Sequence, residues 1–295
     1  MSGIAAYTDY LLRNLSYRIP RNIPVIDIGS GHAPLIRADV LCDRFPGATR
    51  ERAVASIFMP GGRFVVGDLL DLPFADSAFG FSFNRAVMEH LPDPLHACAE
   101  LSRISRAGLV SVPSWLWETM GGSAQHLWLI SEMDGKLVFR RKTRDNSRLA
   151  GLIPEHIRNS RYYEKFFMRF SKDFFIDHYW SGSIKAEVEG ENRPAGDVFV
   201  KESGDEVLLT AKDIEARIQR GTSAARRARQ WAFSLIRMLM GGRKVDIHSV
   251  IACPACKNGL QSGKAGQLVC EACRCGYPCY GGVPVLLKNH AQPVA

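Results

Sequence analysis

Five short apolar runs recur along the first 114 residues, and most of them end in turn-forming or acidic residues. The runs are PVIDIGS at 24–30, ADVLCD at 38–43, RFVVGDL at 63–69, AFGFSFNRA at 78–86 and AGLVSVPS at 107–114. Apolar runs of this length are typical of strands buried on both faces of a parallel sheet. A helical segment, DPLHACAELSRIS at 93–105, separates the last two runs. The pattern predicts a three-layer α/β domain with a doubly wound, mainly parallel sheet.

The rest of the chain divides into regions of different composition. The chain has 295 residues, 46% of them hydrophobic, which fits one large domain with a smaller one. We predict four regions: the core of the α/β domain at 1–114, a lid or substrate-recognition insertion at 115–160, the end of the sheet with a basic amphipathic helix at 161–245, and a small metal-ligated ribbon at 246–295.

The third region contains several expected elements. A helix near 160–172 precedes an antiparallel pair, WSGSIKAEVEG at 180–190 and DVFVKES at 197–203, which could complete the edge of the sheet. Helical spacing then runs through 211–220 and 222–240 until Gly241 and Gly242 stop it. Because the last helix is basic and amphipathic, it could dock on the sheet or lie in a membrane interface.

The chain is basic, with a formal net charge of +8 and a pI near 9.1. This charge favours acidic or phosphorylated partners, RNA or anionic lipid surfaces without choosing among them. Residues 136–172 hold eleven Lys or Arg against three acids, which indicates either a substrate-facing basic surface or an ordinary solvated face. No stretch reaches the roughly 18 apolar residues of a membrane span, and the N-terminus lacks a secretory signal pattern. We therefore expect a cytoplasmic protein without a transmembrane segment.

The first apolar run leads directly into the turn Gly29-Ser30-Gly31, within VIDIGSGHAP. Glycines let a backbone approach a ligand closely, and ligands of open parallel sheets lie beyond the carboxyl ends of the strands. His32-Ala33-Pro34 stands where a dinucleotide-binding GxGxxG motif would finish, which argues against a pyrophosphate site. The turn therefore predicts a ligand site of another kind.

Acidic residues close the next two runs. Asp43 could accept hydrogen bonds from ribose hydroxyls, and Asp68 could accept one from an adenine amino group. Two carboxylates at strand ends suit a cationic adenosyl ligand and would repel a diphosphate. Each could also merely cap a turn, and Asp39 is an alternative ribose ligand nearby.

Residues 25–113 resemble the class I methyltransferase family of the type 11 kind. The resemblance includes the stretch DLPFADSAFGFSFNRAVMEHLPDP at 71–94. The resemblance implies a mainly parallel seven-stranded Rossmann-like sheet and S-adenosylmethionine as methyl donor. It also implies that Asp27, Gly29 and Gly31 surround the methionine moiety, with Asp43 at the ribose and Asp68 near the adenine.

Methyl transfer from a sulfonium is an in-line displacement that needs alignment of two reactants and exclusion of water, while a general base is optional. Asn84 and Arg85 follow the fourth run and would face donor and acceptor. They differ from the Asn/Asp-Pro-Pro-aromatic signature of enzymes that methylate exocyclic amines. His90 and His126 are the candidate bases, although a Glu-His pair is a common structural feature of the family and a His between aromatics is often only packed.

Six of the eight cysteines crowd the C-terminal region. Cys253, Cys256, Cys270 and Cys273 form two CxxC pairs separated by thirteen residues, a spacing that brings four thiolates to a tetrahedral zinc ion. Cys275 could replace Cys273 as a ligand. Because four cysteines leave no open coordination position, we expect a structural zinc that supplies folding energy to a small ribbon.

The tail also resembles the zinc-ribbon family that includes the activator subunit of tRNA, ribosomal-RNA and release-factor methyltransferases. The matching features are both CxxC pairs and the ending from Tyr277-Pro278 to Gly282-Val283-Pro284-Val285-Leu286-Leu287. In that family the ribbon stabilises a catalytic partner and supports donor binding, and fusion would supply the partner at high effective concentration.

These observations predict a methyltransferase that uses S-adenosylmethionine and an unidentified acceptor. An RNA or translation factor, or a small or lipid-linked metabolite, would fit the charge and the amphipathic helix. The alternative is a catalytically silent methyltransferase-like scaffold that binds a partner through its basic surface and ribbon. An intact set of Asp27, Gly29, Gly31, Asp43 and Asp68 argues against a silent scaffold.

Overall fold

The computed structural model describes residues 3–46, 62–121, 123, 125–142, 160, 162, 166, 169–190, 224–263 and 266–294. The chain divides into two compact units. Unit 1 contains residues 1–83, 103–106 and 208–295, and unit 2 contains residues 84–102 and 107–207. Among the described residues, no helix combines the length and the apolar composition that are needed to cross a membrane.

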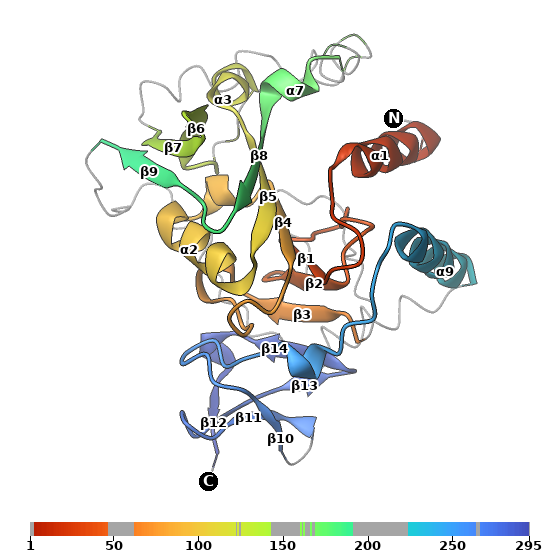
Figure 1. Ribbon diagram of the computed structural model, residues 1–295, viewed down its shortest axis with the longest axis vertical. Helices are drawn as coiled ribbons and strands as arrows, with labels where there is room; N and C mark the ends of the chain where they lie inside the picture. The colour runs from red at the N-terminus through yellow and green to blue at the C-terminus, as the bar shows by residue number, and fades with distance from the viewer. Residues whose placement is uncertain are drawn as a thin grey trace. The chain divides into compact units, whose positions relative to one another are not determined.

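The largest sheet has eight strands in the order β13-β14-β3-β2-β1-β4-β5-β8 (Figure 1). The strand β1 pairs in parallel with β2, and β2 pairs in parallel with β3. The sheet is mainly parallel, as predicted, and the five apolar runs form its first five strands. The bounds are β1 (Val25–Ile28), β2 (Val40–Asp43), β3 (Phe64–Gly67), β4 (Phe81–Arg85), β5 (Ala107–Pro113), β8 (Phe175–Ser181), β13 (Cys279–Tyr280) and β14 (Val283–Leu286).

Two of the eight strands, β13 and β14, come from the C-terminal segment and extend the sheet. All four residues of β14 are buried, and β14 pairs in parallel with β3 through Val285 opposite Val66 and Leu286 opposite Gly67. Figure 1 shows β14 beside β3, within unit 1. The resemblance implied seven strands, whereas this sheet has six strands from the earlier part of the chain and two, β13 and β14, from the apolar ending of the ribbon. The strand β14 covers an edge of β3 that would otherwise expose unpaired backbone groups.

The connection from β1 to β2 contains no helix, although the sequence left room for a short one. Residues 31–39 form turns. The side chain of Asp27 accepts a hydrogen bond from the amide of Leu35 at 2.7 Å, and Asn14 accepts one from the amide of Ile36 at 2.8 Å. These side chains satisfy backbone donors that a helix would otherwise use, so the turns are stable without helical hydrogen bonds.

Asp39 lies just before β2, at the end of the strand opposite to Asp43. Its carboxylate is fully buried and pairs with Arg37 at 2.9 Å and with Arg237 at 2.6 Å. It also accepts a hydrogen bond from the amide of Val25 at 3.0 Å. These partners make Asp39 a structural anchor, which removes it as a ribose ligand at the other end of the strand.

Two helices of unit 1 contact each other. They are α1 (Gly3–Ser16), which the sequence analysis did not predict, and α9 (Ala224–Leu239). The rings of Tyr10 and Phe233 lie 5.9 Å apart. The helix α9 ends at Leu239, two residues before Gly241, which has a φ of 84° in the region that favours glycine; the sequence predicted a stop at Gly241 and Gly242.

Unit 2 also contains a small sheet that is separate from the large one. The three-stranded sheet has the order β6-β7-β9, and the sharp turn between β6 and β7 places both Asp134 and Gly135 at positive φ. The strand β8, antiparallel to β5, completes the edge of the large sheet, whereas β9 pairs in parallel with β7. The expectation that residues 180–190 form one edge strand was therefore wrong, because they divide between two sheets. The bounds are α2 (Pro94–Ile104), α3 (Trp115–Gly121), β6 (Trp128–Met133), β7 (Lys136–Arg141), α7 (Ser171–Phe174) and β9 (Ala186–Glu189).

Several expected elements lie outside the described residues. They are the strand at 197–203, the helix at 211–220, residues 143–159 of the lid, and part of the helix expected near 160–172. The described part of the expected lid is α3 followed by the β6 and β7 hairpin, so this segment has secondary structure of its own. Its role as a lid stays a prediction.

The ribbon forms a four-stranded sheet in the order β10-β11-β12-β15. It contacts the core through the segment 71–75, because Ala252 donates a backbone hydrogen bond to Pro73 at 2.9 Å and Ala75 donates one to Val250 at 2.9 Å. Lys288 also pairs with Asp71 at 2.5 Å. The bounds are η4 (Ile247–Ser249), β10 (Gln261–Ser262), β11 (Leu268–Cys270), β12 (Cys275–Tyr277), η6 (Lys288–His290) and β15 (Gln292–Pro293).

Candidate functional site

The glycine turn follows β1 at its carboxyl end. Gly29 and Gly31 have φ values of 75° and 50°, which favour glycine. The amides of Gly29 and Ser30 both donate to the carbonyl of Cys42, at 2.8 and 3.2 Å, so the turn is tied to β2. The hydroxyl of Ser30 is buried and has no hydrogen-bond partner among the described residues. This hydroxyl was not among the predicted site residues, and it is a polar group that a ligand could satisfy.

Asp43 holds the other side of the turn from the end of β2. Its carboxylate is buried and accepts hydrogen bonds from the amide of Gly31 and the amide of Phe45, each at 2.8 Å. The structure therefore places Asp43 against the turn and within reach of its backbone, at the carboxyl ends of β1 and β2.

Asp68 follows β3 and has two partners of its own. It accepts a hydrogen bond from the amide of Leu70 at 3.0 Å and so caps the short helix η1 (Leu69–Asp71). Its other oxygen pairs with Arg44 at 2.7 Å. The turn-capping alternative is thus realised for Asp68, and its role toward an adenine stays a prediction.

The carboxylates of Asp27, Asp43 and Asp68 all influence the pKa of one buried thiol, that of Cys42. Burial raises the pKa of Cys42 well above its usual value, and the negative charges of Asp43, Asp68 and Asp27 raise it further. The thiol is therefore neutral at physiological pH.

The candidate bases lie together in unit 2, which also contains Asn84, buried near the end of β4. The rings of His90, on the short helix η2 (Met88–His90), and His126 lie 4.6 Å apart, edge to face. His126 shares a hydrogen bond through Nδ1 with Glu118, whose other oxygen pairs with Lys142 at 2.9 Å. The sequence analysis named the two histidines separately and missed Glu118 and Lys142, for which no spacing pattern gives a signal.

Glu89 precedes His90 and is 1% exposed. Burial raises the pKa of its carboxyl, and the neighbouring His90 and His126 lower it. Its Oε2 has no hydrogen-bond partner among the described residues. Glu89 thus belongs to the same group of side chains as the two histidines.

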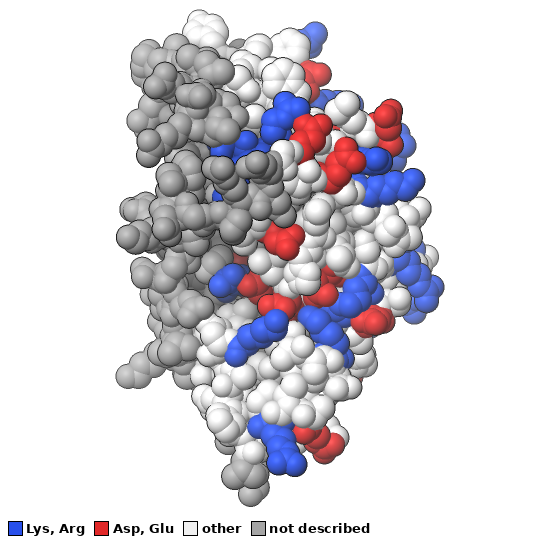
Figure 2. Space-filling view, turned by 90° about the vertical axis from the view of Figure 1, so that its left-hand side faces the viewer, with Lys and Arg blue, Asp and Glu red and all other residues white. Residues whose placement is uncertain are grey.

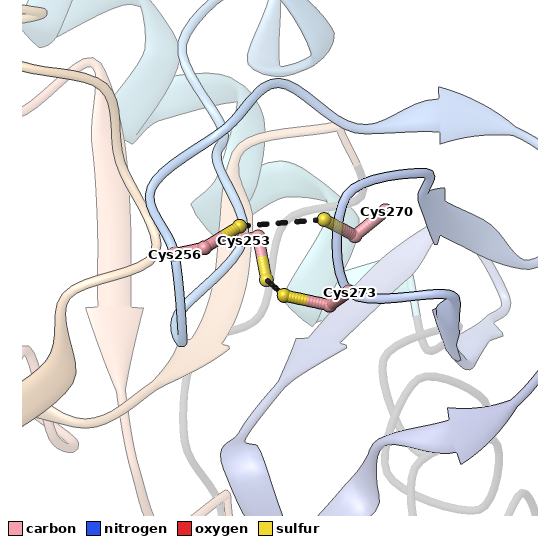
Figure 3. A group of neighbouring side chains, drawn as sticks. All are labelled: Cys253, Cys256, Cys270 and Cys273. Carbon is pink, nitrogen blue, oxygen red and sulfur yellow. Dashed lines mark hydrogen bonds between the residues drawn. The ribbon is translucent and has the colours of Figure 1, made fainter.

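The four cysteines predicted as zinc ligands meet in the ribbon (Figure 3). Their sulfur atoms all lie within 4.8 Å of one another, with Cys253 and Cys273 at 3.9 Å and Cys256 and Cys270 at 3.5 Å. Tetrahedral zinc with bonds of about 2.3 Å places its sulfur ligands about 3.8 Å apart, so the spacing fits this ion. The sulfur of Cys275 is not in this group and instead lies 3.6 Å from the Tyr277 hydroxyl.

Backbone hydrogen bonding in the first CxxC turn favours the thiolate form of one ligand. The backbone of Asn258 lowers the pKa of Cys256 to about 6, so this sulfur is deprotonated at neutral pH. Deprotonated thiols are the form that binds metal.

Comparison with known proteins gives two different matches along the chain. Residues 40–110, from β2 into β5, match the family model described as a methyltransferase domain. A protein from Thermotoga maritima described as a SAM-dependent methyltransferase shares 18% identity at a TM-score of 0.28, and the match covers 38% of this chain and 58% of that chain. A complex between the Haloferax volcanii Trm112 methyltransferase activator and a protein named as a methyltransferase gives 18% identity and a TM-score of 0.28, with 37% and 54% covered. This chain spans little more than half the length of either of those structures.

The curated relatives are much shorter than this chain. A UPF0434 protein of Shewanella pealeana is 49% identical over 47 residues, which are 16% of this chain and 82% of that protein. A UPF0434 protein of Shewanella halifaxensis is 50% identical over 46 residues, or 15% of this chain and 81% of that protein. At this identity and coverage of the relatives, the chain belongs to the UPF0434 protein family.

Proposed function

We propose that the protein is a methyltransferase that binds S-adenosylmethionine at the glycine turn of unit 1. The observation that carries the proposal is the buried carboxylate of Asp43 bonded to the amide of Gly31 at the carboxyl ends of β1 and β2. The methyltransferase-domain match over residues 40–110 supports it. In open parallel sheets, such ends are where ligands bind.

The side chains around the turn fit this donor. S-adenosylmethionine combines a positive sulfonium, an amino group and ribose hydroxyls, all of which are attracted by carboxylates. Asp27, Gly29 and Gly31 would hold the methionine moiety, Asp43 the ribose and Asp68 the adenine. The unsatisfied hydroxyl of Ser30 offers one further polar contact. When bound, the donor supplies an electrophilic methyl group.

Isothermal calorimetry with S-adenosylmethionine, S-adenosylhomocysteine and NAD tests the proposal. We expect the first two to bind and NAD not to bind, because carboxylates at the strand ends repel a diphosphate. Folded protein that binds neither adenosyl compound would overturn the donor assignment and favour the silent scaffold.

The methyl acceptor is part of this proposal, and two classes are candidates: an RNA or translation factor, and a small or lipid-linked metabolite. Among the described residues of the basic stretch, Lys136 pairs with Glu187 at 3.1 Å, Arg140 pairs with Glu189, and Lys142 pairs with Glu118. On the face drawn in Figure 2, basic and acidic side chains are interspersed, without one continuous basic patch. An acidic, phosphorylated or RNA acceptor therefore gains little support from this part of the chain.

The exposed face of α9 favours a peripheral membrane contact and a lipid-linked acceptor. Trp231 is 69% exposed, and Leu235, Met238 and Leu239 are exposed on the same side of the helix, at spacings of four, seven and eight residues. The sequence analysis gave docking on the sheet as one alternative, but these side chains do not pack there. The first half of the helix also contains Arg226, Arg227 and Arg229, a composition typical of helices that lie on anionic membranes.

The membrane contact is tested with vesicles. We expect the protein to sediment with vesicles of anionic phospholipid and not with purely zwitterionic ones, and Trp231→Ala to weaken the partition several-fold, because tryptophan anchors helices at membrane interfaces. Trp115→Ala, which removes another exposed tryptophan, is the matched control and should leave sedimentation unchanged. Equal sedimentation of the Trp231→Ala variant and the parent would contradict the α9 assignment.

The ribbon would bind one structural zinc ion through Cys253, Cys256, Cys270 and Cys273 and would stabilise the donor-binding sheet through β14. Fusion would keep such a stabiliser at high effective concentration. Because zinc ligation requires reduced cysteines, a reducing compartment such as the cytoplasm fits the proposal.

A further inference from the structure

Unit 2 contains a second group of metal-ligating side chains, far in the sequence from the cysteines. Ligand atoms of Glu89, His90 and His126 all lie within 4.8 Å of one another. Two chain segments contribute, and the amide of Leu127 donates to the carbonyl of Glu89 at 2.7 Å, which holds them together. The group therefore belongs to one local framework.

A carboxylate orients one of the imidazoles. Glu118 is fully buried and binds Nδ1 of His126, while Lys142 fixes Glu118 through its other oxygen and donates to the carbonyl of Ser123 at 2.8 Å. Because Nδ1 of His126 is engaged, Nε2 is its ring nitrogen for a ligand. A carboxylate behind a histidine in this way is the common support of metal-binding imidazoles.

Glu89 provides the independent indication of a cation. Its side chain is almost completely buried, and Oε2 has no hydrogen-bond partner among the described residues. A buried carboxylate oxygen without a donor is costly, and a bound cation removes that cost. Two histidines beside such an oxygen complete a mixed nitrogen and oxygen set.

We propose that Glu89, His90 and His126 bind one divalent transition-metal ion. Two imidazole nitrogens and one carboxylate oxygen suit Mn²⁺, Fe²⁺, Co²⁺ or Zn²⁺ better than Ca²⁺ or Mg²⁺, which prefer oxygen ligands throughout. Three protein ligands leave coordination positions for water or for oxygen atoms of a bound molecule. This last step rests on the proposed methyltransferase function: the ion would bind a methyl acceptor that carries a hydroxyl or another oxygen atom able to ligate a metal.

Titration with Co²⁺ of protein that carries one zinc ion per chain, in the cysteine cluster, tests the metal site, with no S-adenosylmethionine present. We expect one additional Co²⁺ per chain with weak visible d–d absorption and without the intense thiolate-to-metal band that cobalt in the cysteine cluster would give. His90→Ala should weaken cobalt binding at least tenfold, and so should Glu89→Gln, which keeps the shape of the side chain.

His178→Ala is the matched control, because His178 is another buried histidine of unit 2 that pairs with a glutamate, Glu132, at 2.8 Å but belongs to no metal-ligating group among the described residues. It should bind cobalt as the parent does. Folded, zinc-loaded parent that takes up no cobalt would overturn the proposal, and so would equal binding by the parent and the Glu89→Gln variant. Neither outcome depends on donor binding, so failure of the metal site and failure of the proposed function are distinguishable.

Discussion

Replacing Cys253 and Cys256 with Ser is expected to remove the zinc ion and to destabilise the whole of unit 1. Structural zinc contributes about 10–16 kcal/mol of apparent binding free energy in zinc-finger peptides, so loss of even part of it would lower the melting temperature by on the order of 10 °C or more. The effect should reach the donor site, because the ribbon carries β14 and β14 pairs with β3. Metal analysis and calorimetric melting measure both results.

Cys275→Ser is the matched control for this prediction. Cys275 lies in the same ribbon, two residues beyond Cys273, and its sulfur is outside the group of four. The control should retain about one zinc ion per chain and melt near the parent. A zinc-free Cys275→Ser variant beside a zinc-loaded Cys273→Ser variant would show that the ligand assignment is wrong.

Asp43→Asn is expected to weaken S-adenosylmethionine binding by about 10- to 100-fold, which corresponds to the roughly 1.5–3 kcal/mol of a hydrogen bond to a charged group. The amide retains one acceptor oxygen for the backbone but loses the negative charge and one acceptor. Binding should fall mainly through the ribose and the cationic parts of the ligand. Calorimetry of the variant against the parent gives the ratio of dissociation constants.

Asp76→Asn controls for the loss of one carboxylate from unit 1. Asp76 is exposed and pairs with Arg103 at 2.8 Å, at a site without the glycine turn. We expect its affinity for the donor to match that of the parent. An Asp43→Asn variant that binds as tightly as Asp76→Asn would remove Asp43 from the donor site.

The parts of the fold that could be predicted are those that short stretches of sequence determine by themselves. The strands β1 to β5 appear in the sequence as apolar runs, because burial on both faces allows few polar residues within them. The grouping of Cys253, Cys256, Cys270 and Cys273 follows from two short turns of fixed spacing. The tie between the glycine turn and Asp43 follows from parallel strands that end at the same edge.

The parts that escaped prediction depend on contacts between distant residues. The turns after Gly31 are held in part by Asn14, which accepts a hydrogen bond from the amide of Ile36, and nothing near Ile36 signals this contact. The network of Glu118, His126 and Lys142 forms only when α3 and β7 come together around the segment between them. Likewise, the apolar ending of the ribbon predicts burial but does not identify β3 as its neighbour.

The pairing of β14 with β3 also constrains the order in which the protein can fold. A chain made on the ribosome presents residues 64–67 long before residues 283–286, so the edge of β3 stays without its native neighbour during most of synthesis. Pairing across such a sequence separation is slow, and an open strand edge can pair with other chains meanwhile. A strand that is made late thus completes a sheet that begins in the first half of the chain, so a nascent chain interrupted before residue 283 would expose an unpaired strand edge that can bind other chains.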